Sequence, residues 1–231
     1  MKSGLDELSE AGLNGGFLMS LPRGAAERLL AEAIRINVPA GAVIYRDEES
    51  PRLIVVVRGL LRVYLTAVDG RQVTIRYARS GDVAGLVLVI GGPASISIQA
   101  VTSALVVALR VDSLRALLAS DPGVACACAE ELARQLHQLL DDISEQAFLS
   151  VRQRLARQLL LLATAGPGRD LVVRAGQQEL ADAIGSVREV VTRNLHQLHE
   201  DGLVDLSRDE ITLRDPLALA AVAHEPARRA G

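Results

Sequence analysis

The sequence contains no tryptophan, and aromatic residues make up only 2% of its 231 positions. A hydrophobic core must therefore be built from aliphatic side chains, which the 49% of hydrophobic residues can supply. The chain has only two cysteines, Cys126 and Cys128. Two thiols are too few for a disulfide framework, and their scarcity is typical of a protein kept in a reducing cytoplasm.

Long apolar runs are also missing. No stretch can span a bilayer as a helix, and the first residues lack the basic and apolar segments of a secretory signal. We therefore expect a cytoplasmic protein without a membrane partner. The chain also lacks a net positive charge, because its 25 basic residues are outnumbered by 28 acidic ones and the net charge is −3. Binding to nucleic acid would have to depend on a local basic surface.

Residues 177–204 predict two short helices that are separated by a tight turn. Apolar residues recur at helical spacing in the first helix, at Leu180, Ala181 and Ile184. Gly185 is expected to end this helix in a left-handed conformation, and Ser186 to act as the N-cap of the next helix. The apolar face of the second helix consists of Val187, Val190, Val191, Leu195 and Leu198. This arrangement is typical of a helix-turn-helix, whose second helix enters the major groove of DNA.

The outer face of that second helix carries residue types that read base pairs. An arginine can donate to O6 and N7 of guanine, and a glutamate can accept from N4 of cytosine. Helical spacing places Arg188 one turn from Thr192, with Glu189 and Arg193 beside them. We predict that these four residues and Ser186 contact DNA. The alternative is a solvated helix with an intrahelical pair between Glu189 and Arg193.

Residues 35–112 have the pattern of a small β-barrel or sandwich. Short runs rich in valine, isoleucine and leucine are separated by turn sequences. The runs are 42–46, 52–57, 59–67, 72–78, 95–101 and 104–111. Asp69-Gly70 is the clearest hairpin turn among them. A loose arm is expected before about residue 20, followed by a helix over 21–34.

A long helix is predicted from Asp121-Pro122 to about Phe148. Residues recur in it at alternating steps of four and three, at Ala125, Ala129, Leu132, Leu136, Leu139, Ile143 and Gln146. Such a heptad stripe can pack on its own barrel or on a partner helix. We favour a partner helix, because helix-turn-helix proteins usually dimerise to match two half-sites. The expected dimer seam is Leu132, Leu136, Leu139 and Ile143.

The remaining segments complete a DNA-binding domain. Residues 151–165 predict a helix whose arginines, Arg152, Arg154 and Arg157, are expected to face solvent, with phosphate contacts as the alternative. Residues 203–206 and 211–213 flank a polar turn and predict a β-hairpin wing.

The order of a small β-barrel, a long heptad helix and a winged helix-turn-helix resembles that of the cyclic-AMP receptor protein and fumarate–nitrate regulator (Crp/Fnr) family. The most specific matches are Glu179-Leu180-Ala181, Ile184-Gly185, Arg188-Glu189-x-Val191-x-Arg193-x-Leu195 and Asp201-Gly202-Leu203-Val204. By this resemblance Arg188, Glu189 and Arg193 take the family's base-reading positions.

The resemblance implies an α+β chain with four parts. These are a cyclic-nucleotide-binding-type β-barrel (jelly roll) at 20–121, a dimerisation helix and hinge at 122–149, a winged helix-turn-helix at 150–216 and a tail at 217–231, which is left without assigned structure.

Three departures from the family's cyclic-nucleotide pattern predict that this chain does not bind cyclic AMP in the usual way. After Gly85, Leu86 stands where that pattern has a glutamate for the ribose, and Ala94-Ser95 stand where it has Arg-Ser for the phosphate. On the long helix, Leu139-Leu140 replace the polar pair that would reach the purine. An apolar pocket cannot compensate for desolvating a phosphate. These six positions form the candidate effector pocket, which either accepts an apolar effector or, as we prefer, is filled by its own side chains.

No metal or cofactor is expected. Two cysteines cannot provide the four ligands usual for an iron–sulfur cluster, and at positions i and i+2 of a helix they point to different faces. The predicted barrel contains no histidine to ligate haem, and the histidines elsewhere form no metal-type cluster. We expect both cysteines to be buried near the dimer seam. A redox role between subunits is the alternative.

The sequence thus predicts a homodimeric transcription regulator that binds double-stranded DNA, and that contacts RNA polymerase if it is an activator. A shift of the two recognition helices, transmitted through the long helix and a hinge at 148–150, would regulate it. No catalytic triad, phosphate-binding loop or pair of carboxylates in an apolar setting indicates an enzyme. The alternative is an effector-binding or scaffold protein with degenerate DNA binding, which the acidic net charge favours.

Overall fold

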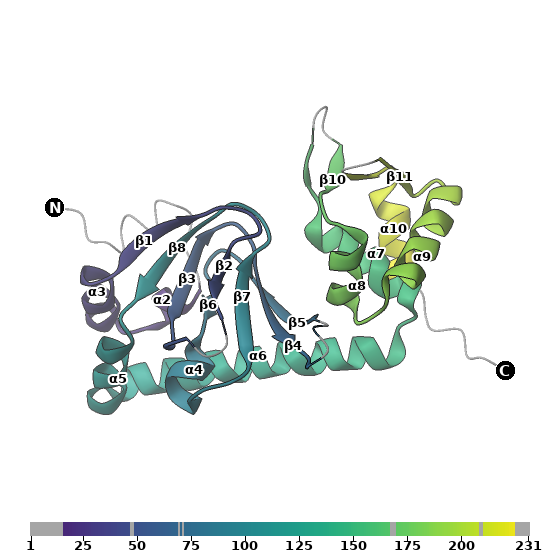
Figure 1. The fold of residues 1–231 in the computed structure, drawn as a ribbon. Coiled ribbons are helices and arrows are strands. Elements are labelled where there is room, and N and C mark those ends of the chain that lie inside the picture. The colour runs from purple at the N-terminus through teal and green to yellow at the C-terminus, as the bar shows by residue number, and fades with distance from the viewer. Residues whose placement is uncertain are drawn as a thin grey trace. The chain divides into compact units, whose positions relative to one another are not determined.

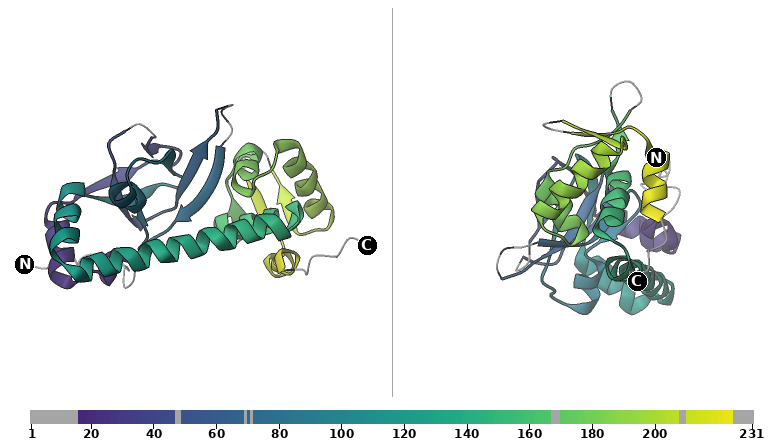
Figure 2. Two further views of the ribbon diagram at one scale, coloured as in Figure 1. Left: turned by 90° about the horizontal axis from the view of Figure 1, so that it is seen from below. Right: turned by 90° about the vertical axis from the view of Figure 1, so that its right-hand side faces the viewer.

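The computed structural model describes residues 16–46, 49–68, 70, 72–166, 170–207 and 210–224 (Figures 1 and 2). The chain divides into two compact units, whose main boundary falls within the long helix α6 (Pro122–Phe148), between Leu139 and Leu140. Residues 72–74 group with the second unit. Among the described residues, no helix is both long and apolar enough to cross a membrane.

Two four-stranded sheets form the N-terminal unit. The first has the order β1 (Ile34–Val38), β8 (Ala104–Leu109), β3 (Leu53–Arg58) and β6 (Val83–Ala84). The second has the order β2 (Val43–Tyr45), β7 (Ile96–Ala100), β4 (Leu61–Thr66) and β5 (Gln72–Ala78). Neighbouring strands are mostly distant in sequence, and the sheets do not close into a barrel. The jelly-roll prediction is confirmed in this open form.

Strand β3 shows why this region is so rich in aliphatic residues. Its first five residues are all buried, because both faces of its sheet are covered. Ile54 and Val56 face the core between the two sheets, together with Leu61 and Ile98. The alternate residues, from Leu53 onward, face a second core that the helices cover.

The covering helices are α2 (Phe17–Ser20), α3 (Arg23–Ala31), α4 (Leu86–Gly91), α5 (Val111–Ser120) and the first part of α6. The prediction of a loose arm is wrong for residues 16–20, because Phe17 and Leu18 are buried. A close backbone contact fixes this segment: Gly16 has a φ of 97°, and a Cβ there would lie 2.3 Å from the Gly81 carbonyl oxygen. Residues 1–15 lie outside the described part of the chain.

The predicted hairpin turn joins β4 to β5. The N–H of Gly70 donates to the carbonyl oxygen of Ala67 (2.9 Å), and Gly70 has a φ of 84°. Asp69 lies outside the described residues.

The C-terminal unit contains, in its described part, the end of α6, four further helices and a small sheet. The helices are α7 (Val151–Leu162), α8 (Gln177–Ile184), α9 (Arg188–Glu200) and α10 (Pro216–His224). The sheet has the order β11 (Val204–Leu206), β12 (Ile211–Leu213), β10 (Leu171–Val173) and β9 (Thr164–Ala165). Strands β11 and β12 form the predicted wing, of which residues 208–209 lie outside the described part.

Helix α10 lies in a segment for which the sequence predicts no defined structure. Asp215 caps this helix, since its side-chain oxygen accepts from the N–H of Ala218 (2.9 Å). Leu219 and Ala223 are buried, and α10 packs on α7. The structured domain therefore extends to His224, while 225–231 lie outside the described residues.

Helix α6 carries an exposed apolar stripe whose register differs in part from that of the predicted heptad. Leu132 packs against the core of its own unit, and Leu139 is half-buried. Leu136 and Ile143 are about half exposed, as is Leu140 between them (55%, 54% and 50%). The exposed positions recur at steps of three and four, at Cys126, Ala129, Ala133, Leu136, Leu140 and Ile143. We call these six residues the α6 stripe. The side chain of Gln146, the last predicted heptad position, lies outside the described ones.

Candidate DNA-binding site

Helices α8 and α9 form the predicted helix-turn-helix. Gly185 follows α8 in the left-handed conformation (φ 62°), as expected. The N–H of Ser186 donates to the Ala181 carbonyl oxygen (2.9 Å), so Ser186 belongs to the turn. Helix α9 begins two residues later, with Val187 as its N-cap residue and no side-chain cap. The prediction that Ser186 caps α9 is therefore wrong.

The outer face of α9 presents three charged side chains to solvent. Arg188, Glu189 and Arg193 are exposed, while the opposite face buries Val191, Leu195 and Leu198 in the domain core. Glu189 lies in the first turn, where the helix dipole stabilises a negative charge. Because its opposite face packs in the core, α9 presents two guanidinium groups and one carboxylate on its exposed surface.

Thr192 has a different environment from these three residues. Its hydroxyl oxygen lies 2.6 Å from the side-chain oxygen of Gln177 and 2.9 Å from the Arg188 carbonyl oxygen. Gln177 is the first residue of α8, so this contact joins the two helices of the motif. The DNA contact of Thr192 stays a prediction, and its hydroxyl is hydrogen-bonded within the protein.

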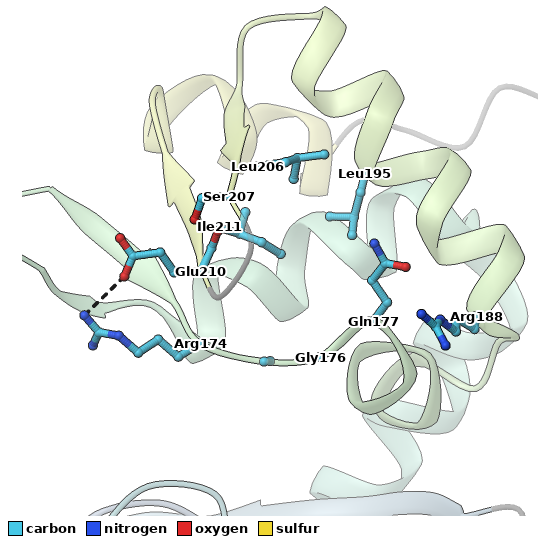
Figure 3. A pocket seen from close by; sticks show the side chains of 10 residues that line it. Arg174, Gly176, Gln177, Arg188, Leu195, Leu206, Ser207, Glu210 and Ile211 are labelled. Atoms are coloured by element: carbon cyan, nitrogen blue, oxygen red, sulfur yellow. Dashed lines mark hydrogen bonds and ion pairs between the residues drawn. The ribbon is translucent and has the colours of Figure 1, made fainter.

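A cleft of about 500 Å³ opens between the start of α9 and the wing (Figure 3). Two guanidinium groups, those of Arg174 and Arg188, lie along it with the carboxylate of Glu210. Its other lining residues are Ala175, Gly176, Gln177, Leu195, Leu206, Ser207 and Ile211. Sequence reasoning did not identify Arg174, Gln177 or Glu210, because their convergence depends on the pairing of β10 with β12.

The three arginines of α7 are predicted to face solvent, but each of them contacts another part of the domain. Arg152 forms an ion pair with Asp201 at the end of α9. Arg154 donates to the carbonyl oxygen of Ile184, the last residue of α8. Arg157 Nη2 lies 3.5 Å from Nδ1 of His224, in α10. Each arginine thus connects α7 to a different helix of the domain.

Arg154 is partly buried. Burial lowers the pKa of its guanidinium, and its Nε is buried without a hydrogen-bond partner. Its contact with Ile184 satisfies a carbonyl group that the end of a helix leaves without an intrahelical partner.

The candidate effector residues are dispersed in the N-terminal unit. Leu86 follows the left-handed Gly85 and is buried in the core that the helices cover. Ala94 packs against the separate core between the sheets, and Ser95 is exposed. Leu139 is half-buried and Leu140 exposed, both on α6. The structure thus divides these side chains between two hydrophobic clusters and the surface.

A polar cluster connects α6 to the turn before β6. The carboxylate of Glu131, only 7% exposed, accepts hydrogen bonds from Arg134 Nε (2.9 Å) and Nη2 (2.7 Å) and from Gln135 Nε2 (2.5 Å). Arg134 Nη2 also lies 3.3 Å from Asp82 Oδ1. Gln135 Nε2 makes a second contact, with the Val83 carbonyl oxygen (3.3 Å). The hydrogen bond from Arg134 to Glu131 raises the pKa of the Arg134 guanidinium.

Arg76 of β5 belongs to the same cluster. Its Nη2 donates to the Val83 carbonyl oxygen (2.5 Å), while its Nη1 is buried without a partner. Burial lowers the pKa of this guanidinium, and the carboxylates of Asp82 and Glu131 oppose that shift. Two arginines and two carboxylates therefore balance their charges at this junction.

The two cysteines differ in exposure. Cys128 is buried, as predicted, but Cys126 is exposed because it lies on the α6 stripe. Within the described residues, no group of three or more histidine, cysteine, aspartate or glutamate side chains is placed to hold a metal ion.

A winged helix-turn-helix that follows a jelly-roll domain and a long helix defines the class of two-domain DNA-binding regulators. Residues 35–121 match the cyclic nucleotide-binding domain family, and residues 153–222 match the Crp-like helix-turn-helix domain family. The cyclic AMP receptor protein of Thermus thermophilus is 31% identical over 182 residues, which cover 78% of this chain and 83% of that protein. The CRP-like cAMP-activated global transcriptional regulator of Mycobacterium tuberculosis is 24% identical over 212 residues, covering 89% of this chain and 95% of the relative.

Solved structures show the same relationship. A Crp/Fnr-family transcriptional regulator from Thermus thermophilus aligns with a TM-score of 0.72 at 27% identity, covering 83% of this chain and 99% of that one. A regulator of this family from Eubacterium rectale shares the fold, with a TM-score of 0.79 at 22% identity over 90% of this chain and 97% of that one. The chain belongs to the Crp/Fnr family and is a DNA-binding transcription regulator of that type.

Proposed function

We propose that this regulator acts as a homodimer that reads a two-fold symmetric operator through Arg188, Glu189 and Arg193. The observation that carries this proposal is the face of α9, where these three side chains are exposed above a buried apolar face. Their chemistry matches G·C pairs, since arginine donates to guanine and glutamate accepts from cytosine. Ser186 lies in the turn just before α9, next to these three residues in the sequence, and we propose that it contacts the DNA backbone.

The α6 stripe supports the proposed dimer. It presents Leu136, Leu140 and Ile143, each about half exposed, at heptad spacing on a long helix. A second copy of the same helix would bury this stripe on both sides, with small residues at its N-terminal end. Two recognition helices held by such a dimer can match two half-sites of DNA.

We further propose that the protein does not use cyclic AMP in the usual way. The positions expected to hold the nucleotide are occupied by apolar side chains or lie at the surface, and Leu86 is packed in a core. The junction between β6 and α6 is bridged by the chain's own charged groups, Glu131, Arg134 and Asp82. In this respect we expect the chain to differ from the two relatives above, whose names refer to cyclic AMP.

The rest of the proposal follows from this role. A transcription regulator works in the cytoplasm on double-stranded DNA, without catalysis, and contacts RNA polymerase if it activates. The alternative is a binding or scaffold protein that has lost sequence-specific DNA binding, which the net charge of −3 favours.

Selection of bound sequences from a random duplex pool, without added ligand, tests the proposal. Recovery of a symmetric site is expected. Arg188→Ala and Arg193→Ala should each then lose roughly 1–3 kcal/mol of discrimination at one base pair. Arg115→Ala, which removes an exposed arginine from α5 in the other unit, is the matched control and should bind normally. If both α9 variants bind the selected site as tightly as the unmodified protein, these arginines do not read bases. If a site is enriched only when cyclic AMP is added, the proposal on the effector is wrong.

A further inference from the structure

Arg174 and Glu210 are held opposite each other by the register of the wing sheet. Val173 of β10 pairs with Ile211 of β12, and the next residue on each side is Arg174 or Glu210. Their side chains form an ion pair, with Arg174 Nη2 3.3 Å from Glu210 Oε2 (Figure 3). Facing residues of an antiparallel pair are close enough to interact, so the ladder itself brings these two charges together.

The turn of the wing also fixes the position of Glu210. The N–H of Ser207 and its hydroxyl both donate to the Glu210 carbonyl oxygen, at 3.0 and 2.8 Å. Glu210 is therefore anchored through its main chain, while its carboxylate lies in the cleft beside Arg174 (Figure 3).

The surroundings of Arg174 favour an anion. Arg174 lines the same cleft as Arg188 of α9 and as Gly176 and Gln177 at the N-terminus of α8. The first N–H groups of a helix lack intrahelical partners, and the helix dipole is positive at this end. Glu210 is the acidic residue among those that line the cleft, and in the free protein its carboxylate forms an ion pair with Arg174.

The ion pair is exposed enough to exchange partners. The Arg174 side chain is 59% exposed and that of Glu210 is 33% exposed. Exposed pairs of this kind contribute little stability, so a second anion can compete for the arginine at low cost. A DNA phosphate is such an anion, and most contacts that position a protein on DNA are made to phosphates.

We propose that Glu210 restrains DNA affinity by holding Arg174 in an internal ion pair, and that a backbone phosphate replaces the carboxylate when the cleft meets DNA. This inference rests on the DNA-facing orientation of α9 proposed above. It adds a contact that is independent of base sequence. Glu210 then lowers affinity for every duplex, whereas Arg188 and Arg193 determine which duplex is preferred.

The test compares dissociation constants for the selected operator and for a duplex of random sequence, by fluorescence anisotropy over a series of salt concentrations. Glu210→Gln keeps the shape of the side chain and removes its charge. It should bind both duplexes more tightly, by about twofold to fivefold for each subunit that contacts the duplex, the range that one exposed ion pair allows. Arg174→Ala should weaken both, lower the salt slope by about one phosphate contact for each subunit bound and abolish the gain from Glu210→Gln in the double variant.

Two controls distinguish this effect from the general consequences of removing a charge or an ion pair. Asp201→Asn removes the same charge and also breaks an ion pair, with Arg152, but outside the cleft, so it should leave both affinities unchanged. Arg188→Ala should weaken the operator complex more than the complex with the random duplex. The inference is overturned if Glu210→Gln leaves both affinities unchanged, or if its gain persists in the Arg174→Ala background. If Arg188→Ala has no effect on either duplex while the Glu210 and Arg174 variants behave as expected, base reading fails and this inference stands.

Discussion

The hydroxyl oxygen of Thr192 lies 2.6 Å from the side-chain oxygen of Gln177, so the recognition helix is hydrogen-bonded to the first residue of α8. The angle between the two helices determines how α9 is presented to a major groove. A threonine on the outer side of α9 therefore contributes to the geometry of the motif, although its position in the sequence is that of a DNA contact.

Replacing this hydroxyl should weaken the motif. Thr192→Val exchanges the hydroxyl for a methyl group of similar shape, and we expect the free energy of unfolding of the C-terminal unit to fall by about 1 kcal/mol. Urea unfolding of the full chain measures this loss. Thr192→Ser keeps the hydroxyl and should stay close to the unmodified protein. If the Thr192→Val protein has full stability but binds its operator more weakly, Thr192 contacts DNA directly.

Arg154 is expected to stabilise the turn between α8 and α9. Arg154→Met keeps most of the side-chain length but removes the donor to the Ile184 carbonyl oxygen. Losing the partner of that carbonyl group should lower the free energy of unfolding by about 1–3 kcal/mol. Arg188→Met, on the exposed face of α9, serves as the matched substitution and should not change stability. Equal unfolding curves for the two variants would show that the Arg154 contact is dispensable.

The helix-turn-helix could be predicted from the sequence because its signals are local. The left-handed Gly185 and the apolar spacing in α8 and α9 lie within one short segment. The same holds for the Gly70 turn and for the aliphatic runs of the two sheets. What was missed depends on contacts between distant residues. The donor to Ile184 is Arg154, thirty residues earlier, and the pairing of Arg174 with Glu210 needs the register of β10 with β12.

Two further misses have physical causes in the sequence pattern. Helix α10 is apolar around most of its circumference, so it shows no helical periodicity that separates a buried from an exposed face. Helix α6 carries leucines on more than one face, because one face covers its own core and another is exposed. The predicted heptad therefore placed Leu132, which packs against the core of its own unit, in one stripe with Leu136, which is exposed.

The corrected register of α6 makes the dimer proposal specific. Leu140→Asp places a charge in the middle of the α6 stripe and should convert the dimer to a monomer. Two buried leucines would be lost per dimer, at a cost of roughly 3 kcal/mol or more. Analytical ultracentrifugation measures the change. Gln138→Asp introduces the same charge at an exposed position of α6 outside the stripe, and should remain dimeric. If Leu140→Asp also stays dimeric, the subunits associate through another surface.

The two cysteines should differ sharply in reactivity. Burial, and secondly the Glu131 carboxylate, raise the pKa of Cys128 to about 11, and its side chain is fully buried. Cys126 is exposed, although its hydrogen bond to Glu130 also raises the pKa of its thiol. Because alkylation needs both a thiolate and access, iodoacetamide near neutral pH should modify Cys126 slowly in the monomeric Leu140→Asp protein, where the α6 stripe is uncovered, and Cys128 only after unfolding. Mass spectrometry of a labelling time course distinguishes the two sites, and Cys126→Ser should take up no label until denaturant is added.

The raised pKa of Cys128 also predicts how stability changes in alkaline solution. The ordinary pKa of a cysteine thiol is 9.0, so on raising the pH the unfolded chain loses this proton before the folded chain does. The contribution of the buried neutral thiol is therefore complete below about pH 9 and is lost progressively as the pH rises towards 11. Cys128→Ala should show a shallower decline of unfolding free energy across this window than the unmodified protein. Parallel declines in the two proteins would mean that other groups, and not Cys128, cause the alkaline loss of stability.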